Sequence, residues 1–196
     1  GRRNVDMLYI LYDNEVYGLT KGQAGPTLGL GEKPKSLPRP NPQGKVNPLL
    51  LAFASGYTWI ARGYAYDVKG LKELIKEGSA HRGLAFLHVL QHYTTYNDLH
   101  TKEWFAPRLY RLEEEGYDPL VPPGLPPEAL EARMARFQQK ALEWGERIPV
   151  GVFWKAELPT FEARLKAYLP RYPEAYPARG PETPLDLEGL LQEFAL

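Results

Sequence analysis

The first half of the chain alternates between short apolar runs and amphipathic segments, and this order limits the folds that it can adopt. Residues 8–12 are continuously apolar or aromatic, which is typical of a strand buried on both faces of a parallel sheet. Residues 57–62 and 83–91 form two more apolar runs of strand length. We therefore expect three strands in this half of the chain.

Helix signals lie between these runs. The segment "NPLLLAFASG" begins with Asn47, a favoured N-cap residue, continues with Pro48 in the first turn and ends at Gly56. Residues 67–78 begin with Asp67, carry an apolar stripe at helical spacing and end at Gly78. Strand, helix, strand, helix, strand in that order predicts an α/β fold with a parallel sheet and helices on both faces.

The remaining segments are less regular. Residues 24–48 are rich in proline and glycine, so we expect a long loop that is either an ordered binding loop or a mobile one. Residues 127–147 are predicted to form a long helix and residues 148–155 a further strand. Residues 158–184 are rich in proline, and we expect this tail to pack over its own domain or a partner.

The composition indicates a globular protein. The chain has 196 residues, of which 43% are hydrophobic and 12% aromatic, enough for one sizeable core. Its 24 Lys and Arg balance 24 Asp and Glu, so the charge does not favour nucleic-acid binding. No apolar run approaches the length of a membrane span, and the start "GRRNVDML" lacks a signal-peptide core. We therefore expect a cytoplasmic protein that does not bind membranes.

The stretch "YDNEVYGLTKGQ", residues 12–23, follows the first predicted strand directly. Ligands of parallel α/β sheets bind beyond the carboxyl ends of the strands, so this stretch is a candidate site by its position. Asn14 offers a neutral carboxamide oxygen to a hard cation such as Mg2+. A backbone carbonyl two residues later can complete the same ring of ligands.

The residues that follow fit a diphosphate group. Gly18 and Gly22 let the backbone approach a phosphate closely, and Thr20, Lys21 and Gln23 add a hydroxyl, a cation and an amide. The pattern is neither a P-loop nor a GxGxxG motif, and an ordinary glycine turn accounts for the spacing equally well. From the residues alone, two interpretations of this stretch remain: a site for a magnesium-bound diphosphate and an ordinary glycine turn.

The stretch "RRNVDMLYILYDNEVYGLTKGQAGPT" resembles the thiamine-diphosphate-binding segment of the beta subunit of 2-oxoacid:ferredoxin oxidoreductases. The resemblance continues through "NPLLLAFASGYTWIARG", "LKELIKEGSAHRGLAFLHVLQ", "TTYN" and "IPVGVFWKAELPTFEARL", and it covers most of the chain. It implies a partial thiamine-diphosphate-binding fold, in which residues 1–100 form the carboxyl-terminal part of the α/β domain. Residues 101–196 would then be an irregular extension that packs on the same domain or on a partner subunit.

The resemblance also implies roles for single residues. Asn14 would bind Mg2+ through its side chain and Val16 through its carbonyl, and the metal would clamp the cofactor's diphosphate. Leu19 would be an apolar wall beside the thiazolium ring, and Lys21 a cation for a carboxylate or for coenzyme A. The implied cofactor-binding set is Asn14, Val16, Tyr17, Gly18, Leu19 and Thr20, the metal set is Asn14 and Val16, and the catalytic set is Leu19, Thr20 and Lys21.

The activity that the resemblance implies is the oxidative decarboxylation of a 2-oxoacid to an acyl-CoA, with electrons passed to ferredoxin. The ylid carbon of thiamine diphosphate would carry the chemistry, while the protein supplies position and electrostatics. The implied partners are the upstream part of the same subunit, an alpha subunit, ferredoxin, the 2-oxoacid and coenzyme A.

The sequence departs from the family pattern in two ways. The family's Gly-Asp-Gly motif, whose aspartate is another magnesium ligand, is not in this sequence, so we expect the chain to be the carboxyl-terminal part of a longer subunit. Tyr93 in "HYTTYN" stands where the family has a cluster-binding cysteine, and the chain contains no cysteine. Because a phenol does not hold cluster iron in the usual way, an iron-sulfur cluster in this chain is doubtful.

Two other functions remain open. A non-catalytic interaction module, or a fragment with an incomplete cofactor site, would keep the fold without the activity. A non-oxidative thiamine-dependent decarboxylase agrees less well, because the lysine-glycine-glutamine motif is closer to the ferredoxin-linked family.

The remaining polar and aromatic residues have plain structural explanations. His88 and His92 are four residues apart, but their segment is predicted as a strand, which does not favour a metal pair. His81 and His100 are expected in loops. Arg62, at the end of its predicted strand, could face a ligand or a subunit or form a surface salt bridge. Core or interface packing explains Trp104, Phe105 and Tyr110. Residues 113–115 are expected to form a solvated helix end.

Overall fold

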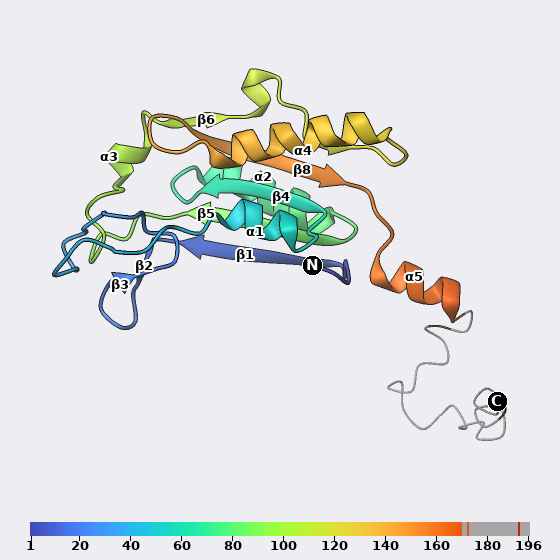
Figure 1. Ribbon diagram of the computed structural model, residues 1–196, viewed down its shortest axis with the longest axis horizontal. Coiled ribbons are helices and arrows are strands. Elements are labelled where there is room, and N and C mark those ends of the chain that lie inside the picture. Colours follow the sequence, from blue (N-terminus) through green and yellow to red (C-terminus); the bar gives the residue numbers. More distant parts are fainter. Residues whose placement is uncertain (170–171, 173–191, 193–196) are drawn as a thin grey trace. The chain divides into compact units, whose positions relative to one another are not determined.

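The computed structural model describes residues 1–169, 172 and 192 (Figure 1). The chain divides into two compact units, Gly1–Thr160 and Phe161–Leu196. In the second unit, the described part is mainly α5 (Phe161–Tyr168), which lies inside the predicted proline-rich tail. The rest of that predicted tail, apart from residues 158–160, Leu169 and Tyr172, falls outside the described residues.

The first unit is built around one mixed sheet. Its strand order is β1-β5-β4-β8-β6, and β7 also pairs with β8. The strands β1, β5 and β4 are parallel, as the sequence predicts, whereas β8 runs antiparallel to β4. The bounds are β1 (Met7–Asp13), β4 (Trp59–Tyr64), β5 (Leu84–Leu90), β6 (Leu109–Arg111), β7 (Leu120–Val121) and β8 (Ile148–Ala156), with a separate hairpin of β2 (Val16–Tyr17) and β3 (Gln23–Ala24).

Helices cover both faces of the sheet, which confirms the predicted architecture (Figure 1). On one face, α1 (Pro48–Ala54) and α4 (Pro127–Leu142) share a core with β4, β5 and β8. On the other face, α2 (Val68–Ala80) packs its apolar stripe against a second core. The shorter helices are α3 (Lys102–Phe105) and the 3-10 helix η1 (Glu113–Glu115).

The expectation that the first strand is buried on both faces is wrong for this chain. In the sheet as described, β1 is an edge strand whose one partner is β5. Met7, Tyr9 and Tyr12 are each about half exposed or more, and Tyr12 is 60% exposed. An apolar run alone cannot distinguish two covered faces from one covered face beside an open edge, and here the edge is open.

The predicted helix starts are confirmed. The side chain of Asn47 accepts hydrogen bonds from the amides of Leu49 and Leu50, and that of Asp67 accepts from the amide of Gly70. These three bonds satisfy amides that the first helical turn leaves free.

The predicted helix ends are less accurate. Gly78 does not end α2, which continues to Ala80; it is buried where the helix approaches the sheet. A Cβ atom built on Gly78 would lie 3.0 Å from atoms of both Leu8 and Trp59. The long helix α4 ends at Leu142 instead of residue 147, because Glu143 has extended backbone angles.

The second half of the chain contributes directly to the sheet. Strands β6, β7 and β8 join β4, so residues 101–160 pack on the same unit as residues 1–100. The proposed domain boundary at residue 100 stays a prediction. Within the described part of the chain, no helix combines the length and apolarity needed to cross a membrane.

Candidate functional site

The predicted site lies beyond the carboxyl end of β1, where the chain turns into the β2–β3 hairpin. Asn14 stabilises this turn, because its Oδ1 atom accepts a hydrogen bond from the Val16 amide at 3.2 Å. Glu15, between them, has a left-handed backbone with φ 66°. The turn brings Asn14 and Val16 together, as the predicted metal set requires.

The Val16 carbonyl is turned away from β3. Glu15 and Tyr17, on either side of Val16, accept backbone hydrogen bonds from Gly25 at 2.8 Å and Gly22 at 2.7 Å. Carbonyls alternate in direction along a strand, so the intervening Val16 carbonyl faces the opposite way. A backbone oxygen that is free of the ladder, next to a carboxamide, fits the donor set that a hard cation prefers.

The predicted catalytic residues lie at the hairpin tip. Leu19 is 99% exposed, and Lys21 has a left-handed backbone with φ 75°. The Thr20 hydroxyl donates to Oε1 of Gln23 at 2.5 Å, so its side chain is engaged within the hairpin. The geometry therefore presents Leu19 and Lys21 outward, on a tight and strained turn.

A cavity of about 660 Å3 lies between β1, α1 and the turn. Asn14, Val16 and Tyr17 line it, together with apolar residues that include Tyr9 of β1 and Leu51 of α1. The predicted residues 18–21 are not part of its lining. The structure thus places the predicted metal set at a cavity and the predicted catalytic set outside that cavity.

Tyr93 lies against the hairpin. Its Cε1 atom would be 3.2 Å from a Cβ atom built on Gly18, and its ring packs edge-on against Tyr96 at 5.4 Å between centroids. A larger residue at Gly18 would therefore displace the Tyr93 ring. The residue at the expected cysteine position is next to the predicted cofactor-binding stretch.

Three neighbouring strands contribute a buried polar network behind the turn. His88 Nε2 of β5 lies 2.8 Å from Asp13 Oδ2 of β1, and Arg62 Nε of β4 donates to His88 Nδ1 at 3.3 Å. Asp13 also accepts from the Thr27 hydroxyl at 2.5 Å and from the Glu15 amide at 3.0 Å. These bonds place the proton of a neutral His88 on Nε2 and fix the start of the turn.

The pKa shifts agree with that assignment. Burial acts to raise the pKa of Asp13, but the hydrogen bonds from His88 and Thr27 lower it below its usual value. Burial lowers the pKa of His88, and the nearby Arg62 charge adds to that shift. The network is therefore a carboxylate, a neutral imidazole and a guanidinium.

Arg62 does not form a surface salt bridge. Its side chain is fully buried, and its guanidinium lies over Phe153 and Trp144, with 5.4 Å and 5.7 Å from Cζ to the ring centroids. Its Nη1 atom has no hydrogen-bond partner among the described residues. Burial lowers the pKa of Arg62 to about 10, which still leaves it charged near neutral pH.

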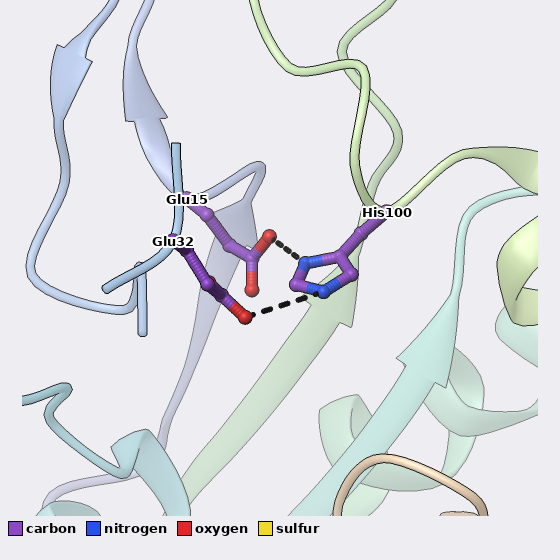
Figure 2. A group of neighbouring side chains, drawn as sticks. All are labelled: Glu15, Glu32 and His100. Carbon is purple, nitrogen blue, oxygen red and sulfur yellow. Dashed lines mark hydrogen bonds and ion pairs between the residues drawn. The ribbon is translucent and has the colours of Figure 1, made fainter. Parts of the chain in front are cut away.

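A second buried cluster lies close to the turn and was not anticipated from the sequence (Figure 2). Glu15, Glu32 and His100 each offer one ligand atom, and these atoms lie within 4.8 Å of one another. His100 Nδ1 contacts Glu15 Oε2 closely, and His100 Nε2 lies 3.5 Å from Glu32 Oε1. Glu15 and His100 are buried, and Glu32 is partly exposed.

His88 and the aromatic residues of the second half have structural partners. His88 belongs to the Asp13 network, and the described residues do not place His92 with it in a metal cluster. Trp104 and Phe105 pack on each other and on His100, as the packing interpretation predicts. Tyr110 lies apart from them and accepts a hydrogen bond from Lys140 at 2.9 Å.

The predicted solvated end at residues 113–115 is the 3-10 helix η1, in which Glu115 pairs with Arg147. His81, by contrast, caps the end of α2 and contacts Thr58.

Two sequence families match the chain. Residues 1–89 match "Thiamine pyrophosphate enzyme, C-terminal TPP binding domain", and residues 94–169 match the carboxyl-terminal region of the "Pyruvate ferredoxin oxidoreductase beta subunit". The first match contains the turn after β1, and the second contains α4 and β8.

Curated relatives carry a consistent name. The chain is 57% identical over 181 residues to a 2-oxoacid:ferredoxin oxidoreductase subunit beta from Sulfolobus sp., covering 91% of this chain and 58% of that protein. It is 49% identical over 202 residues to a subunit of the same name from Saccharolobus solfataricus, covering 98% of this chain and 65% of the relative. The chain thus spans about three fifths of the length of these relatives.

A solved structure shares the fold. It is a 2-oxoglutarate:ferredoxin oxidoreductase from Magnetococcus marinus with 2-oxoglutarate, coenzyme A and succinyl-CoA bound. The TM-score is 0.73 at 27% sequence identity, and the match covers 100% of this chain and 60% of the other.

Proposed function

Because the chain is a homologue of the beta subunit of 2-oxoacid:ferredoxin oxidoreductases, we propose that it forms part of the thiamine-diphosphate site of such an enzyme. The assembled enzyme would decarboxylate a 2-oxoacid oxidatively to an acyl-CoA and pass the electrons to ferredoxin. The observation that carries the proposal is the Asn14–Val16 turn, which brings the Asn14 carboxamide to the Val16 backbone beyond β1.

Asn14 and Val16 would hold Mg2+, and the adjoining stretch from Tyr17 to Thr20 would contact the cofactor. When bound, thiamine diphosphate supplies the carbanion chemistry of the reaction. The buried Asp13 network fixes the residue before Asn14, so the ligand atoms are held in place by β1 and β5. The protein's part at this point is to bind and orient.

Lys21 is suited to a substrate anion. It is displayed at the tip of the hairpin, where an ammonium can meet the carboxylate of a 2-oxoacid or a phosphate of coenzyme A. Leu19 beside it would be an apolar wall, which requires that its exposed side chain be covered by another segment or by a partner protein. The oxidoreductase from Magnetococcus marinus has both kinds of substrate bound, which supports this assignment of substrate class.

The open edge of β1 supports the proposed partners. Among the described residues this edge has no partner strand, and with exposed apolar residues such as Tyr9 it is suited to pairing with a further segment. We assign this edge to an upstream part of the same subunit and the hairpin tip to the interface with an alpha subunit. Ferredoxin would accept electrons from the assembly in the cytoplasm, and any iron-sulfur cluster would need ligands other than cysteines of this chain.

The test is Asn14→Ala in the assembled enzyme, with thiamine diphosphate binding measured by titration in the presence of Mg2+. Loss of a metal ligand should weaken cofactor binding by at least about tenfold, as changes around metal sites do. Asn14→Asp is the matched control, because it retains both an oxygen ligand and an acceptor for the Val16 amide. Wild-type affinity in the alanine variant would contradict the metal assignment and favour a non-catalytic interaction module.

A further inference from the structure

We propose that Glu15, Glu32 and His100 form a binding site for a divalent transition-metal ion, best matched by Zn2+, distinct from the proposed Mg2+ site. The three ligand atoms lie within 4.8 Å of one another, and the carboxylates of Glu15 and Glu32 both face the His100 ring (Figure 2). One imidazole with two carboxylates is a donor set that suits Zn2+ better than Mg2+, which prefers oxygen alone. The inference does not depend on the proposed function.

The contacts of the two ring nitrogens of His100 differ. Its Nδ1 atom contacts Glu15 Oε2 closely, so this nitrogen is engaged with a carboxylate. Its Nε2 atom faces Glu32 Oε1 at 3.5 Å, which is longer than a charge-assisted hydrogen bond. A metal ion between Nε2 and Glu32 would join these two groups.

The spacing agrees with a shared metal. Zn2+ binds imidazole nitrogen and carboxylate oxygen at about 2.0–2.2 Å with tetrahedral angles, which places two ligand atoms about 3.4 Å apart. The separation of His100 Nε2 and Glu32 Oε1 is 3.5 Å. A hydrogen bond between an imidazolium and a carboxylate would be shorter, about 2.7–2.9 Å.

Neighbouring groups orient the ligands in the manner of known metal sites. A metal-bound histidine commonly donates its other ring N–H to a carboxylate, and here Nδ1 contacts Glu15, which is itself one of the three ligands and so also orients the ring. The Asn97 side-chain amide donates to Glu15 Oε2 at 3.1 Å, and the Gly29 amide donates to Glu32 Oε2 at 2.6 Å. Trp104 packs on the His100 ring with 4.2 Å between centroids.

Lys45 is a competing cation whose amine interacts with the charges of Glu15 and Glu32. Burial lowers the pKa of its amine, while the charges of Glu15 and Glu32 oppose that shift. Its Nζ atom lies 3.6 Å from the centroid of the Trp144 ring, so the ammonium already has a cation–π partner. Lys45 therefore balances part of the carboxylate charge while a metal occupies the space between the three ligands.

The site would tie together three segments that are far apart in the sequence. Glu15 belongs to the turn after β1, Glu32 to the loop before α1, and His100 to the segment before α3. Glu15 also lies between Asn14 and Val16, so an ion bound to its side chain would stiffen the turn that presents the proposed Mg2+ ligands. Its role would be structural.

The experiment is a calorimetric titration of the chelator-treated, dialysed protein with Zn2+ near neutral pH, with excess Mg2+ present to fill hard-cation sites. We expect one Zn2+ per chain and a rise in thermal stability on binding. Glu32→Gln and His100→Gln should each weaken Zn2+ binding by at least about 100-fold. Replacing a residue that only supports a metal ligand already costs up to about 100-fold, and removing the ligand itself should cost at least as much. His92→Gln controls for binding by another imidazole and should keep wild-type affinity, while the excess Mg2+ occupies the proposed site at Asn14.

Absence of Zn2+ binding, or binding that survives Glu32→Gln, would overturn the proposal and identify the cluster as an imidazolium ion pair. If His100→Gln does not fold, Glu32→Gln alone decides, because Glu32 is partly exposed and the substitution keeps an acceptor for the Gly29 amide. Failure of the thiamine diphosphate titration would leave the Zn2+ result unaffected, so the two proposals fail separately.

Discussion

The Nε2 atom of His88 lies 2.8 Å from Oδ2 of Asp13, and both side chains are almost completely buried. This contact joins β5 to the last residue of β1. Arg62 on β4 closes the network through the other ring nitrogen of His88. Three parallel strands are thereby locked together immediately before the turn at Asn14.

Replacing His88 should strongly destabilise the fold. His88→Leu conserves much of the side-chain volume but leaves the Asp13 carboxylate and the Arg62 guanidinium buried without their shared partner. Breaking a buried charge network in this way costs about 3–5 kcal/mol. The free energy of unfolding in urea measures the effect.

The matched control is His92→Leu, which removes an imidazole outside this network and should change stability by no more than about 0.5 kcal/mol. A loss below about 1 kcal/mol in His88→Leu would show that Asp13 and Arg62 do not depend on the ring.

His81 should make stability depend on pH. Burial lowers its pKa below 6.5, and the charge of Lys155 adds to the shift. Because the unfolded state then binds more protons, stability is fully present above pH 6.5 and is lost as the pH falls from there to the folded pKa. Urea unfolding of wild type and His81→Gln on both sides of pH 6.5 should show a smaller loss in the variant, whose amide can still donate to Thr58. Equal losses would remove His81 as the cause.

Gly78→Ala should destabilise the protein although alanine favours helices. The new Cβ atom would lie 3.0 Å from both Leu8 and the buried ring of Trp59. Overpacking of this kind costs about 1–3 kcal/mol, which exceeds the roughly 1 kcal/mol gained in helix propensity. Ser79→Ala, the neighbouring exposed position of α2, is the control and should stabilise slightly. Thermal unfolding distinguishes the two, and a higher midpoint for Gly78→Ala would show that the interface can relax.

Local signals in the sequence predict local structure well. The caps Asn47 and Asp67 are predicted because each side chain bonds to amides two or three residues away. Gly78 is misread as a stop because a glycine needed for close packing has the same local appearance as a C-cap. Whether the glycine is a packing residue or a helix stop depends on its contact with Trp59, nineteen positions earlier, and the sequence signals for helix ends consider only neighbouring residues.

Contacts between distant segments are the part that the sequence does not reveal. The exposure of Tyr9 depends on which strand lies beside β1, and an apolar run in the sequence does not identify the neighbouring strand. Arg62 is buried partly by Phe153 and Trp144, which lie more than 80 positions later in the sequence. Glu15 and His100 are 85 positions apart, with no spacing pattern to join them, so their contact emerges only from the fold.

Lys21 offers a test that separates charge from backbone strain. Its φ of 75° is costly for any residue with a Cβ atom, so Lys21→Gly removes the ammonium and relieves the strain, whereas Lys21→Ala removes the ammonium alone. We expect the glycine variant to be about 1 kcal/mol more stable than the alanine variant in urea.

In the assembled enzyme, both variants should raise the KM for the 2-oxoacid or coenzyme A, because the cation that meets the substrate anion is missing. Thiamine diphosphate affinity should stay nearly unchanged, since Asn14 and Val16, and not Lys21, line the cavity beside the turn. Lys21→Arg, which retains the charge, should recover part of the loss. If only the glycine variant changed the kinetics, the rigid backbone of the hairpin would be the functional feature and the ammonium would have no role in substrate binding.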